Sequence, residues 1–283
     1  MKFTKLISWM LIIAGIVFFN SCNDEDGNHI NSAAKLLPSK ITTEYEGGNK
    51  RIYTYQYDDD NRLAEYREIS YFGNNVSLED METICKITYS DDSKIDSLII
   101  IPQLLDPDKS RNITSEISSL VNDTILFEYE GQIVTVKYRN KEDEQILINS
   151  KGEVTAYKYY AGINNLRSIT NTFEYDNKGN ITKTIRNNGI APSLSPYTYI
   201  YDKRNGIFRN MDVPQWFLVI MLNIDFNLVN NYQQYTDYEG GKWAIEYEYN
   251  NDDYPEYSTT KYSGASKIRV SEAPTTYEYI IAK

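Results

Sequence analysis

The sequence predicts a mainly β protein: an antiparallel meander of repeated β-hairpins forming a long twisted or curved sheet, with one or two short helices in insertions. Two observations predict it. A phrase made of Tyr, a polar turn and an aliphatic residue six positions later recurs along the chain, and many of the 26 tyrosines among 283 residues alternate with polar residues. A recurring strand–turn–strand unit defines an architecture before any single residue is considered. Its spacing predicts roughly 14–18 strands.

The turn phrase has four copies, and its fifth position indicates the turn type. The copies are Tyr57–Leu63, Tyr89–Ile95, Tyr175–Ile181 and Tyr201–Ile207, with Asn61, Ser93, Gly179 and Asn205 at the fifth position. Short hairpin loops built on a type I turn need a left-handed residue there, which Gly and Asn adopt most readily. Three copies comply and Ser93 departs. Further turns of this character are expected near Gly47, Gly131, Gly152, Gly240 and Asp253.

Rows of tyrosine are the second signal. Alternating residues share one face of a strand, so each row places its rings side by side. The opposite face, with Thr54, Gln56 and Glu248, is mostly polar, as in a sheet with one wet side. The candidate ligand-binding aromatics are Tyr53, Tyr55, Tyr57, Tyr197, Tyr199, Tyr201, Tyr247 and Tyr249. Packing between cross-strand neighbours is the alternative role for these rings.

Two segments interrupt the hairpins. Between Pro102 and Asn122 the apolar residues follow helical spacing, which predicts a short helix. Asp212 and Pro214 are typical of a helix start before the apolar run Trp216–Leu222. The alternation from Ile224 to Leu228 then predicts a strand. This pair of elements is expected to cover one face of the sheet.

The first residues indicate export and a lipid anchor. Lys2 and Lys5 precede a mostly apolar run that is too short to span a bilayer comfortably and that ends just before Cys22. The small residue before Cys22 resembles the lipobox of Bacteroidetes lipoproteins, which implies acylation of Cys22 and attachment to a membrane. We therefore expect a signal peptide over residues 1–21, an acylated cysteine and flexible acidic tether over 22–38, and one β-hairpin-repeat domain over 39–283.

Asp24, Glu25 and Asp26 follow the cysteine directly. In the same lipoproteins an acidic cluster at this place acts as an export signal, which implies an outer-membrane protein facing the cell exterior. The alternative is a solvated acidic linker. The formal charge of −11 makes nucleic acid a poor partner. With Cys22 acylated, Cys85 has no cysteine partner within the chain.

Several kinds of chemistry lack the residues they need. The single histidine, His29, lies in the expected tether, so neither a Ser–His or Cys–His pair nor a His/Cys zinc site is expected in the domain. No Gly-rich phosphate loop is present. Most carboxylates stand at turns, where they cap the backbone. We therefore expect no enzyme activity, no cofactor and no metal, although paired carboxylates and calcium at Asp58-Asp59-Asp60 and Asp252-Asp253 stay open alternatives.

Two modification sites are suggested by an Asp-Ser/Thr-aliphatic pattern. Ser97 and Thr124 match the pattern that this bacterial group uses for O-glycosylation. Composition alone would produce about one such match, so the pattern marks candidates only.

The Tyr-Asp copies resemble the YD repeats of large bacterial shell proteins. Over residues 40–283 the chain is similar to uncharacterised, Tyr-rich Bacteroidetes surface lipoproteins with YD-like hairpins. The phrases Tyr247–Pro255 and Thr276–Tyr279 carry this resemblance at the C-terminal end. It implies hairpins that wrap as a long β structure, and it brings no catalytic residues.

These observations favour a cell-surface lipoprotein whose domain is a non-catalytic binding or adhesion module. Sugar rings stack on exposed aromatic side chains, so an acidic, Tyr-lined sheet suits a neutral glycan, and a sheet edge suits an envelope or host protein strand. A polysaccharide-acting hydrolase with paired carboxylates and a purely structural envelope lipoprotein are the alternatives.

Overall fold

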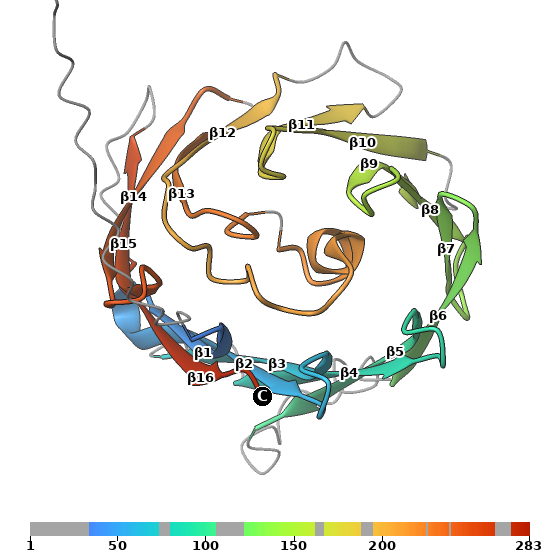
Figure 1. Ribbon diagram of the computed structural model, residues 1–283, viewed down its shortest axis with the longest axis horizontal. Coiled ribbons are helices and arrows are strands. Elements are labelled where there is room, and N and C mark those ends of the chain that lie inside the picture. Colours follow the sequence, from blue (N-terminus) through green and yellow to red (C-terminus); the bar gives the residue numbers. More distant parts are fainter. Residues whose placement is uncertain are drawn as a thin grey trace, which may run out of the picture. The chain divides into compact units, whose positions relative to one another are not determined.

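The protein, seen here as a computed structural model, folds into a closed β-barrel around an inserted segment (Figure 1). The structure describes residues 34–73, 80–105, 122–161, 167–187, 195–224, 226–237, 239–263 and 273–283. The strands are β1 Leu36–Glu44, β2 Asn49–Tyr57, β3 Leu63–Phe72, β4 Met81–Tyr89, β5 Ile95–Leu104, β6 Asp123–Glu130, β7 Ile133–Lys137, β8 Glu144–Ile148, β9 Val154–Ala161, β10 Arg167–Tyr175, β11 Ile181–Asn187, β12 Tyr197–Tyr201, β13 Tyr232–Thr236, β14 Lys242–Tyr249, β15 Pro255–Ser263 and β16 Thr275–Ile281.

The sixteen strands are paired antiparallel in chain order, as the meander predicts, but the sheet is not open. β1 pairs with β16 from Leu36 opposite Ile281 to Thr43 opposite Thr275. This pairing closes the barrel and satisfies both edges, which an open sheet would expose. The prediction of a long twisted or curved sheet is therefore corrected to a closed barrel. β1 also begins inside the expected tether, because Leu37 is fully buried and pairs with Ile280.

The turn phrase forms one kind of hairpin turn at one end of the barrel. In its first copy the Asp58 N–H donates to the Arg62 carbonyl at 3.0 Å, and the Asp58 carboxylate accepts from the Arg62 N–H at 2.9 Å. Asn61 has φ 62°, and the ladder shifts register between Gln56 and Tyr57. This is a type I turn with a left-handed residue and a bulge. The aspartate therefore serves the turn backbone.

Five other turns repeat the backbone bond, and four of them, at Asn149, Asp176, Asp237 and Asn250, also repeat the side-chain bond. Ser90, Asn149, Asp176, Asp237 and Asn250 each close a turn onto the residue four positions later. Ser93 adopts φ 62° although it is neither Gly nor Asn. The sheet on both sides specifies the turn strongly enough to impose this conformation. The turn of the Tyr89 copy therefore forms even with Ser93 at its fifth position.

The Tyr201 copy does not form a hairpin, so that part of the prediction is wrong. Asn205 is absent from the residues with positive φ. The Asp202 N–H donates instead to the carbonyl of Asn231 at 2.9 Å, and the Asp202 carboxylate accepts from the Asn231 N–H at 3.0 Å. The usual turn bonds are thus made to a residue far along the chain. The stretch between them, residues 205–230, is an insertion that we call the plug.

Tyrosines tie each hairpin to the one before it. Seven tyrosine hydroxyls donate to a backbone carbonyl on the neighbouring strand, at distances between 2.7 and 3.1 Å. These latch tyrosines are Tyr57, Tyr89, Tyr129, Tyr175, Tyr201, Tyr247 and Tyr279. On β8 the position equivalent to a latch tyrosine is occupied by Ile148, which has no hydroxyl. Its backbone N–H donates instead to the Gln132 carbonyl at 2.9 Å.

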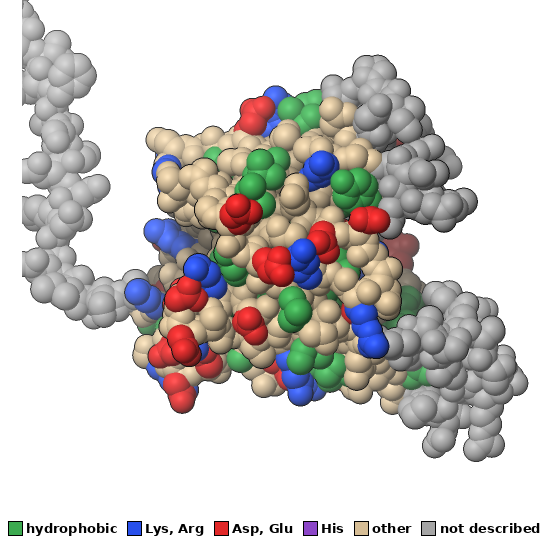
Figure 2. All heavy atoms as spheres, turned by 90° about the vertical axis from the view of Figure 1, so that its right-hand side faces the viewer, with side chains coloured by type: hydrophobic (Ala, Val, Ile, Leu, Met, Phe, Trp, Pro, Cys, Tyr) green, Lys and Arg blue, Asp and Glu red, His purple; other side chains and the backbone are tan. Residues whose placement is uncertain are grey.

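The two faces of the barrel wall differ as the alternation predicts. Inward positions carry the tyrosine rows and aliphatic residues such as Leu63, Ile95 and Ile181, which are almost fully buried. Outward positions carry mostly polar and charged residues, together with exposed apolar ones such as Leu126, Leu147 and Ile200. Figure 2 shows the face over β6 to β9, where acidic and basic side chains are interspersed with isolated apolar ones.

The plug fills the middle of the ring, where Figure 1 shows it in orange. Its one helical element, η4 (Phe217–Met221), is a buried π-helix turn, in agreement with the predicted buried helix. Trp216 and Phe217 pack edge-on against Phe127 of β6, with ring centroids 5.2 and 6.0 Å away. The predicted function of this segment, to cover one face of the sheet, is confirmed for the inner face.

The predicted strand over Ile224–Leu228 is wrong. Asn223 and Asn227 have φ 53° and 59°, which no strand tolerates. The chain bends at both residues, so the alternation of apolar and polar side chains reflects turns inside the barrel. The other predicted helix falls largely on residues 106–121, outside the described residues, and β5 extends to Leu104. The only other helical element in the described part is the 3-10 turn η1 (Glu46–Gly48).

The latch tyrosines predict a barrel that is sensitive to alkali. Burial raises the pKa of Tyr57 and Tyr279 well above the ordinary value near 10, because the phenolate would lose its hydration. The folded chain keeps these protons while the unfolded chain releases them. Stability is therefore complete below about pH 10 and falls as the pH rises further, by about 1.4 kcal/mol per pH unit for each such tyrosine. Urea unfolding at a series of pH values, with tyrosinate absorbance, measures this.

Two substitutions control that experiment. Tyr57→Phe removes one titrating group and its 2.7 Å bond to the Pro38 carbonyl, so we expect a loss of about 1 kcal/mol at pH 8 and a shallower alkaline slope. Tyr160→Phe changes a ring that is 36% exposed on the outer face and should alter neither. Ionisation of most tyrosines near pH 10 in protein that stays folded would contradict the prediction.

Candidate functional site

A cavity of about 600 Å³ lies inside the barrel, between its wall and the plug. Its wall comes from seven consecutive strands around the ring, β13 to β16 and then β1 to β3. Its floor is formed by plug residues, among them Phe208, Leu222 and Ile224. Tyr45 and Arg51, both exposed, stand at its mouth, at the end of the barrel opposite the repeated turns. This volume is typical of small-ligand sites.

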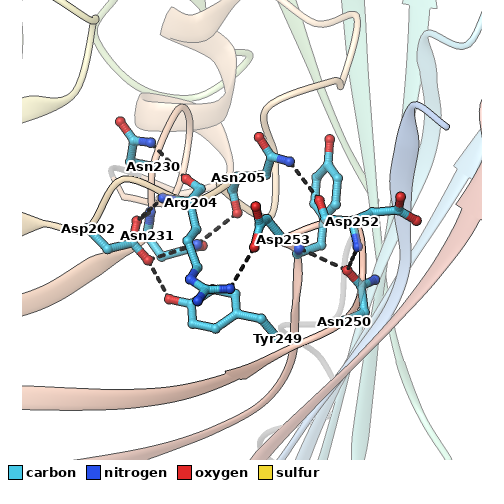
Figure 3. Close-up of polar contacts among 10 residues, drawn as sticks. Asp202, Arg204, Asn205, Asn230, Asn231, Tyr249, Asn250, Asp252 and Asp253 are labelled. Carbon is cyan, nitrogen blue, oxygen red and sulfur yellow. Dashed lines mark hydrogen bonds and ion pairs between the residues drawn. The ribbon is translucent and has the colours of Figure 1, made fainter. Parts of the chain in front are cut away.

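The plug is held in place by polar contacts at the turn end of the barrel (Figure 3). The Arg204 guanidinium lies 2.6 Å from the Asp253 carboxylate, and the Asn205 side chain donates to the Asp252 carbonyl at 2.8 Å. The Tyr249 hydroxyl donates to the Asp202 carboxylate. These contacts connect the start of the plug to the turn between β14 and β15.

The end of the plug is fixed by buried asparagines. The Asn231 side chain donates to the carbonyl of Asn205 at 2.7 Å, and the Asn230 side chain donates to that of Arg204 at 2.7 Å. The Asn180 side chain donates to Asn230 at 3.1 Å and accepts from its N–H at 3.0 Å. Buried polar groups of this kind are costly unless paired. Apart from Asn231 Oδ1, which is buried without a partner, the bonds of this network favour one position of the plug. The floor of the cavity is therefore a fixed part of the core.

Gly206 permits the close approach of the two plug arms. A Cβ added there would lie 2.5 Å from the Asn227 carbonyl oxygen, inside any allowed contact distance. The Gly206 N–H donates to the Val229 carbonyl at 2.9 Å and the Phe208 N–H to that of Asn227 at 3.0 Å. The plug thus has its own backbone ladder, and glycine is required where its arms meet.

The eight candidate aromatics separate into three groups in the structure. Tyr53, Tyr55 and Tyr247 line the cavity, and Tyr247 is at the same time a latch tyrosine, with its hydroxyl on the Tyr232 carbonyl. Tyr57, Tyr201 and Tyr249 place their hydroxyls on Pro38, Ile181 and Asp202, so they hold the fold together. Tyr197 and Tyr199 face inward on β12 without lining the cavity.

The sequence reasoning missed several cavity residues on other strands. Tyr66, Tyr232, Tyr235, Trp243 and Tyr277 all line it. Trp243 and Ile245 extend the Tyr247/Tyr249 row by two steps of the same alternation, which is a signal that could have found Trp243. Tyr232 and Tyr235 lie on either side of a register shift, so no regular alternation joins them.

The electrostatics of the cavity centre on one ion pair. Arg51 Nε lies 3.2 Å from Glu68 Oε1, and both residues line the cavity. The pKa of Tyr53, whose hydroxyl neighbours this pair, is raised by burial and by the Glu68 charge. Burial likewise raises the pKa of Tyr277, deeper in the cavity, to about 12. Tyr53 and Tyr277 are therefore neutral hydrogen-bonding groups at physiological pH.

The remaining predicted residues lie elsewhere. Ser97 is buried on β5, with its hydroxyl 2.7 Å from that of Thr88, whereas Thr124 is exposed on β6. Cys85 is buried, and burial raises the pKa of its thiol to about 11. Cys22, Asp24, Glu25, Asp26 and His29 lie outside the described residues.

The carboxylates at the turns are engaged within the fold. Asp58 and Asp60 pair with Arg62 at 2.8 and 3.4 Å, and Asp59 lies 2.5 Å from Lys283. Within the described ranges no group of three or more His, Cys, Asp or Glu side chains is placed to hold a metal ion. No helix of the described chain is long and apolar enough to cross a membrane.

The chain matches no known protein-family profile and no curated protein. Among solved structures it is similar to a porin-like protein from Bacteroides uniformis ATCC 8492, with a TM-score of 0.50 and 12% sequence identity over 86% of this chain and 96% of that one. A porin-like protein from Bacteroides vulgatus ATCC 8482 aligns with a TM-score of 0.38 and 10% identity over 87% and 99% of the chains. The first likeness extends to the barrel fold alone. The resemblance to YD-repeat lipoproteins stays a prediction.

Proposed function

We propose that the protein is a lipid-anchored, non-catalytic binding module of the outer cell surface, and that its ligand site is the cavity inside the barrel. The observation that carries this proposal is the combination of aromatic walls with a fixed floor. A concave site of this size, lined by aromatic rings and a few polar groups, is the usual form of a small-ligand site. Kinship with YD-repeat-like lipoproteins is part of the proposal.

The plug favours a barrel that is closed at one end and binds ligands (a binding cup) over an open pore. Sixteen-stranded barrels whose centre is empty carry a water-filled channel. Here Trp216, Phe217 and Leu218 are buried in the centre and pack on the wall. A solute entering at the mouth meets the plug, so the barrel holds ligands and does not conduct them.

The charges of the cavity support binding without catalysis. A polysaccharide hydrolase of the kind considered from the sequence needs two carboxyl groups across a cleft. Glu68 is the one carboxylate among the described residues that line the cavity, and it is paired with Arg51. The described lining therefore offers groups that can bind a ligand, but no second carboxyl group opposite Glu68.

The outer face of the barrel supports an anchor at Cys22. Ion pairs lie on it around the ring: Lys40–Glu278 at 2.7 Å, Lys183–Glu174 at 2.8 Å and Lys261–Glu246 at 2.9 Å. Barrels that span a bilayer present an apolar band about 25 Å tall, and a Lys or Arg at its midplane costs about 2–4 kcal/mol. A wall with this many charges fits water, so attachment to the membrane falls to the acyl chains.

Filling the cavity tests the ligand site. Thr260 lines the cavity from β15, and Thr259 beside it faces outward opposite Glu246. We expect residues 34–283, which contain every described strand of the closed barrel, to bind a member of a panel of linear hexasaccharides and envelope peptides. Thr260→Trp should weaken that binding at least tenfold, whereas Thr259→Trp should not. Isothermal titration calorimetry measures both.

Two results of that titration would contradict the proposal. Equal binding by the two Trp variants would place the ligand outside the cavity. Failure of the wild type to bind anything in the panel would favour the structural envelope role.

Substitution of Cys22 tests the anchor. In cells that make the full chain, the wild type should sediment with outer membranes and resist a carbonate wash, and Cys22→Ala should be released. Cys85→Ala, a change at the buried cysteine, is the matched control and should stay attached. Substitution of Asp24, Glu25 and Asp26 by alanine should preserve attachment to the membrane. It should also make the protein inaccessible to protease added outside the cells, because the protein would no longer be exported to the outer surface. Retention of Cys22→Ala in washed membranes would show insertion of the barrel itself.

A further inference from the structure

The cavity has two stacked aromatic faces, one at each end of its wall. On β2 and β3, Tyr53 and Tyr66 stack with ring centroids 5.9 Å apart and planes 15° apart. On β13 and β14, Tyr235 and Trp243 stack at 5.6 Å and 8°. Tyr53, Tyr235 and Trp243 are half-buried, whereas Tyr66 is buried, and the Trp243 ring also contacts that of Tyr262 at 4.5 Å. The half-buried rings offer apolar contact at low entropic cost. They suit ligands with flat apolar faces, and sugar rings have such faces.

Between the two aromatic faces the wall is rich in hydroxyl groups. The Thr43 and Thr275 hydroxyls lie 3.0 Å apart, and those of Ser258 and Tyr277 lie 2.8 Å apart, with either partner able to donate. Hydroxyls both donate and accept, so these pairs can rearrange to meet a ligand that also does both. Sugar hydroxyls have this property.

The charges of the lining cancel. Arg51 and Glu68 are the charged side chains among the described lining residues, and they pair with each other at 3.2 Å. The two side chains are 45% and 34% exposed, and because they pair with each other the lining presents no net charge to attract an anionic or a cationic ligand. The site therefore favours a neutral ligand.

The shape of the cavity limits how a chain can enter. Ile207, Phe208 and Leu222 close it from below, and the packed plug lies beyond them. A long polymer cannot thread through the barrel, and a volume of about 600 Å³ holds only a short piece of it. Only an end of such a chain can reach the aromatic faces.

From these observations we infer that the cavity takes the terminal sugars of a neutral glycan chain, inserted end-on. This rests on the proposed binding function and specifies its ligand. Trp243 and Tyr235 provide one stacking face, Tyr53 and Tyr66 the other, and the threonine, serine and tyrosine hydroxyls between them recognise the sugar hydroxyls.

Tryptophan fluorescence is the readout, because the chain without its signal peptide has two tryptophans in different environments. Trp216 is buried in the plug and Trp243 is half-buried in the cavity. Acrylamide should quench the Trp243 emission of residues 34–283, and Trp243→Phe should remove that quenchable part. The probes are linear β-1,4-mannose and β-1,4-glucose oligomers of four to ten units, and the same oligomers oxidised at C6 to carboxylates.

We expect a neutral oligomer to protect Trp243 from acrylamide, and Trp243→Ala to weaken its binding at least tenfold. Tyr257→Ala, a change on the outer face of β15, should leave binding unaltered. The dissociation constant per chain should be the same from four to ten units, because each chain offers one entering end. The oxidised oligomers should bind at least tenfold more weakly. Glu68→Gln removes the partner of Arg51 and should reduce the difference in affinity between the neutral and the oxidised oligomers.

The outcomes that overturn the inference are distinct. Affinity that rises with chain length shows side-on binding, and preference for the oxidised oligomers shows an anionic ligand. If no oligomer of either kind binds while an envelope peptide does, and Thr260→Trp blocks that peptide, the glycan inference fails and the binding cup stands. If nothing in either panel binds, both fail.

Discussion

A closed sheet of sixteen strands encloses more space than its own side chains can fill, and the rest of this structure depends on how that space is occupied. Eight strands make a barrel whose interior side chains just meet, whereas sixteen leave a lumen. The chain supplies the missing core from within a single turn, because residues 205–230 leave the sheet after β12 and return to it before β13. Asp202 and Asn231 make the turn bonds across this insertion. The plug fills one end of the lumen, and what it leaves empty is the cavity.

Tyrosine serves the fold and the cavity from the same inner face. At the turn end its hydroxyl reaches a carbonyl of the preceding hairpin, so Tyr89 on Leu63 and Tyr129 on Ile95 join neighbours without water. A few residues further along the sheet, tyrosine rings such as Tyr53 and Tyr55 line the cavity. Tyr247 does both, because its ring lines the cavity while its hydroxyl donates to the Tyr232 carbonyl. An aromatic row thus supplies both structural latches and part of the cavity wall.

The sequence predicted the strands and their turns well because these depend on local chemistry. Asp58 and Asn61 specify a turn within five residues, and the polar outward face follows from period-two alternation. Closure was not predictable, since it depends on the summed register of every pair and on the meeting of Leu37 with Ile280. The Tyr201 copy misled because a turn and an insertion begin with the same residues and differ only in the residue that completes the bonds. Of the cavity, the Tyr53 and Tyr247 rows were found and Tyr235 was not, because only the closed barrel brings β13 and β2 to one cavity.

The central claim is that the plug is a permanent part of the core, which makes the barrel a cup. Native-state hydrogen exchange tests it most directly at the Gly206, Phe208 and Ile224 amides, which donate to carbonyls within the plug at 2.9, 3.0 and 2.8 Å. If the plug is permanent, these amides exchange only through global unfolding, with the same free energy as the amides of β2 and β3. Exchange of the plug amides at a free energy several kcal/mol below that of the strands would mean that the plug leaves the lumen while the barrel stays folded. That result would contradict the account.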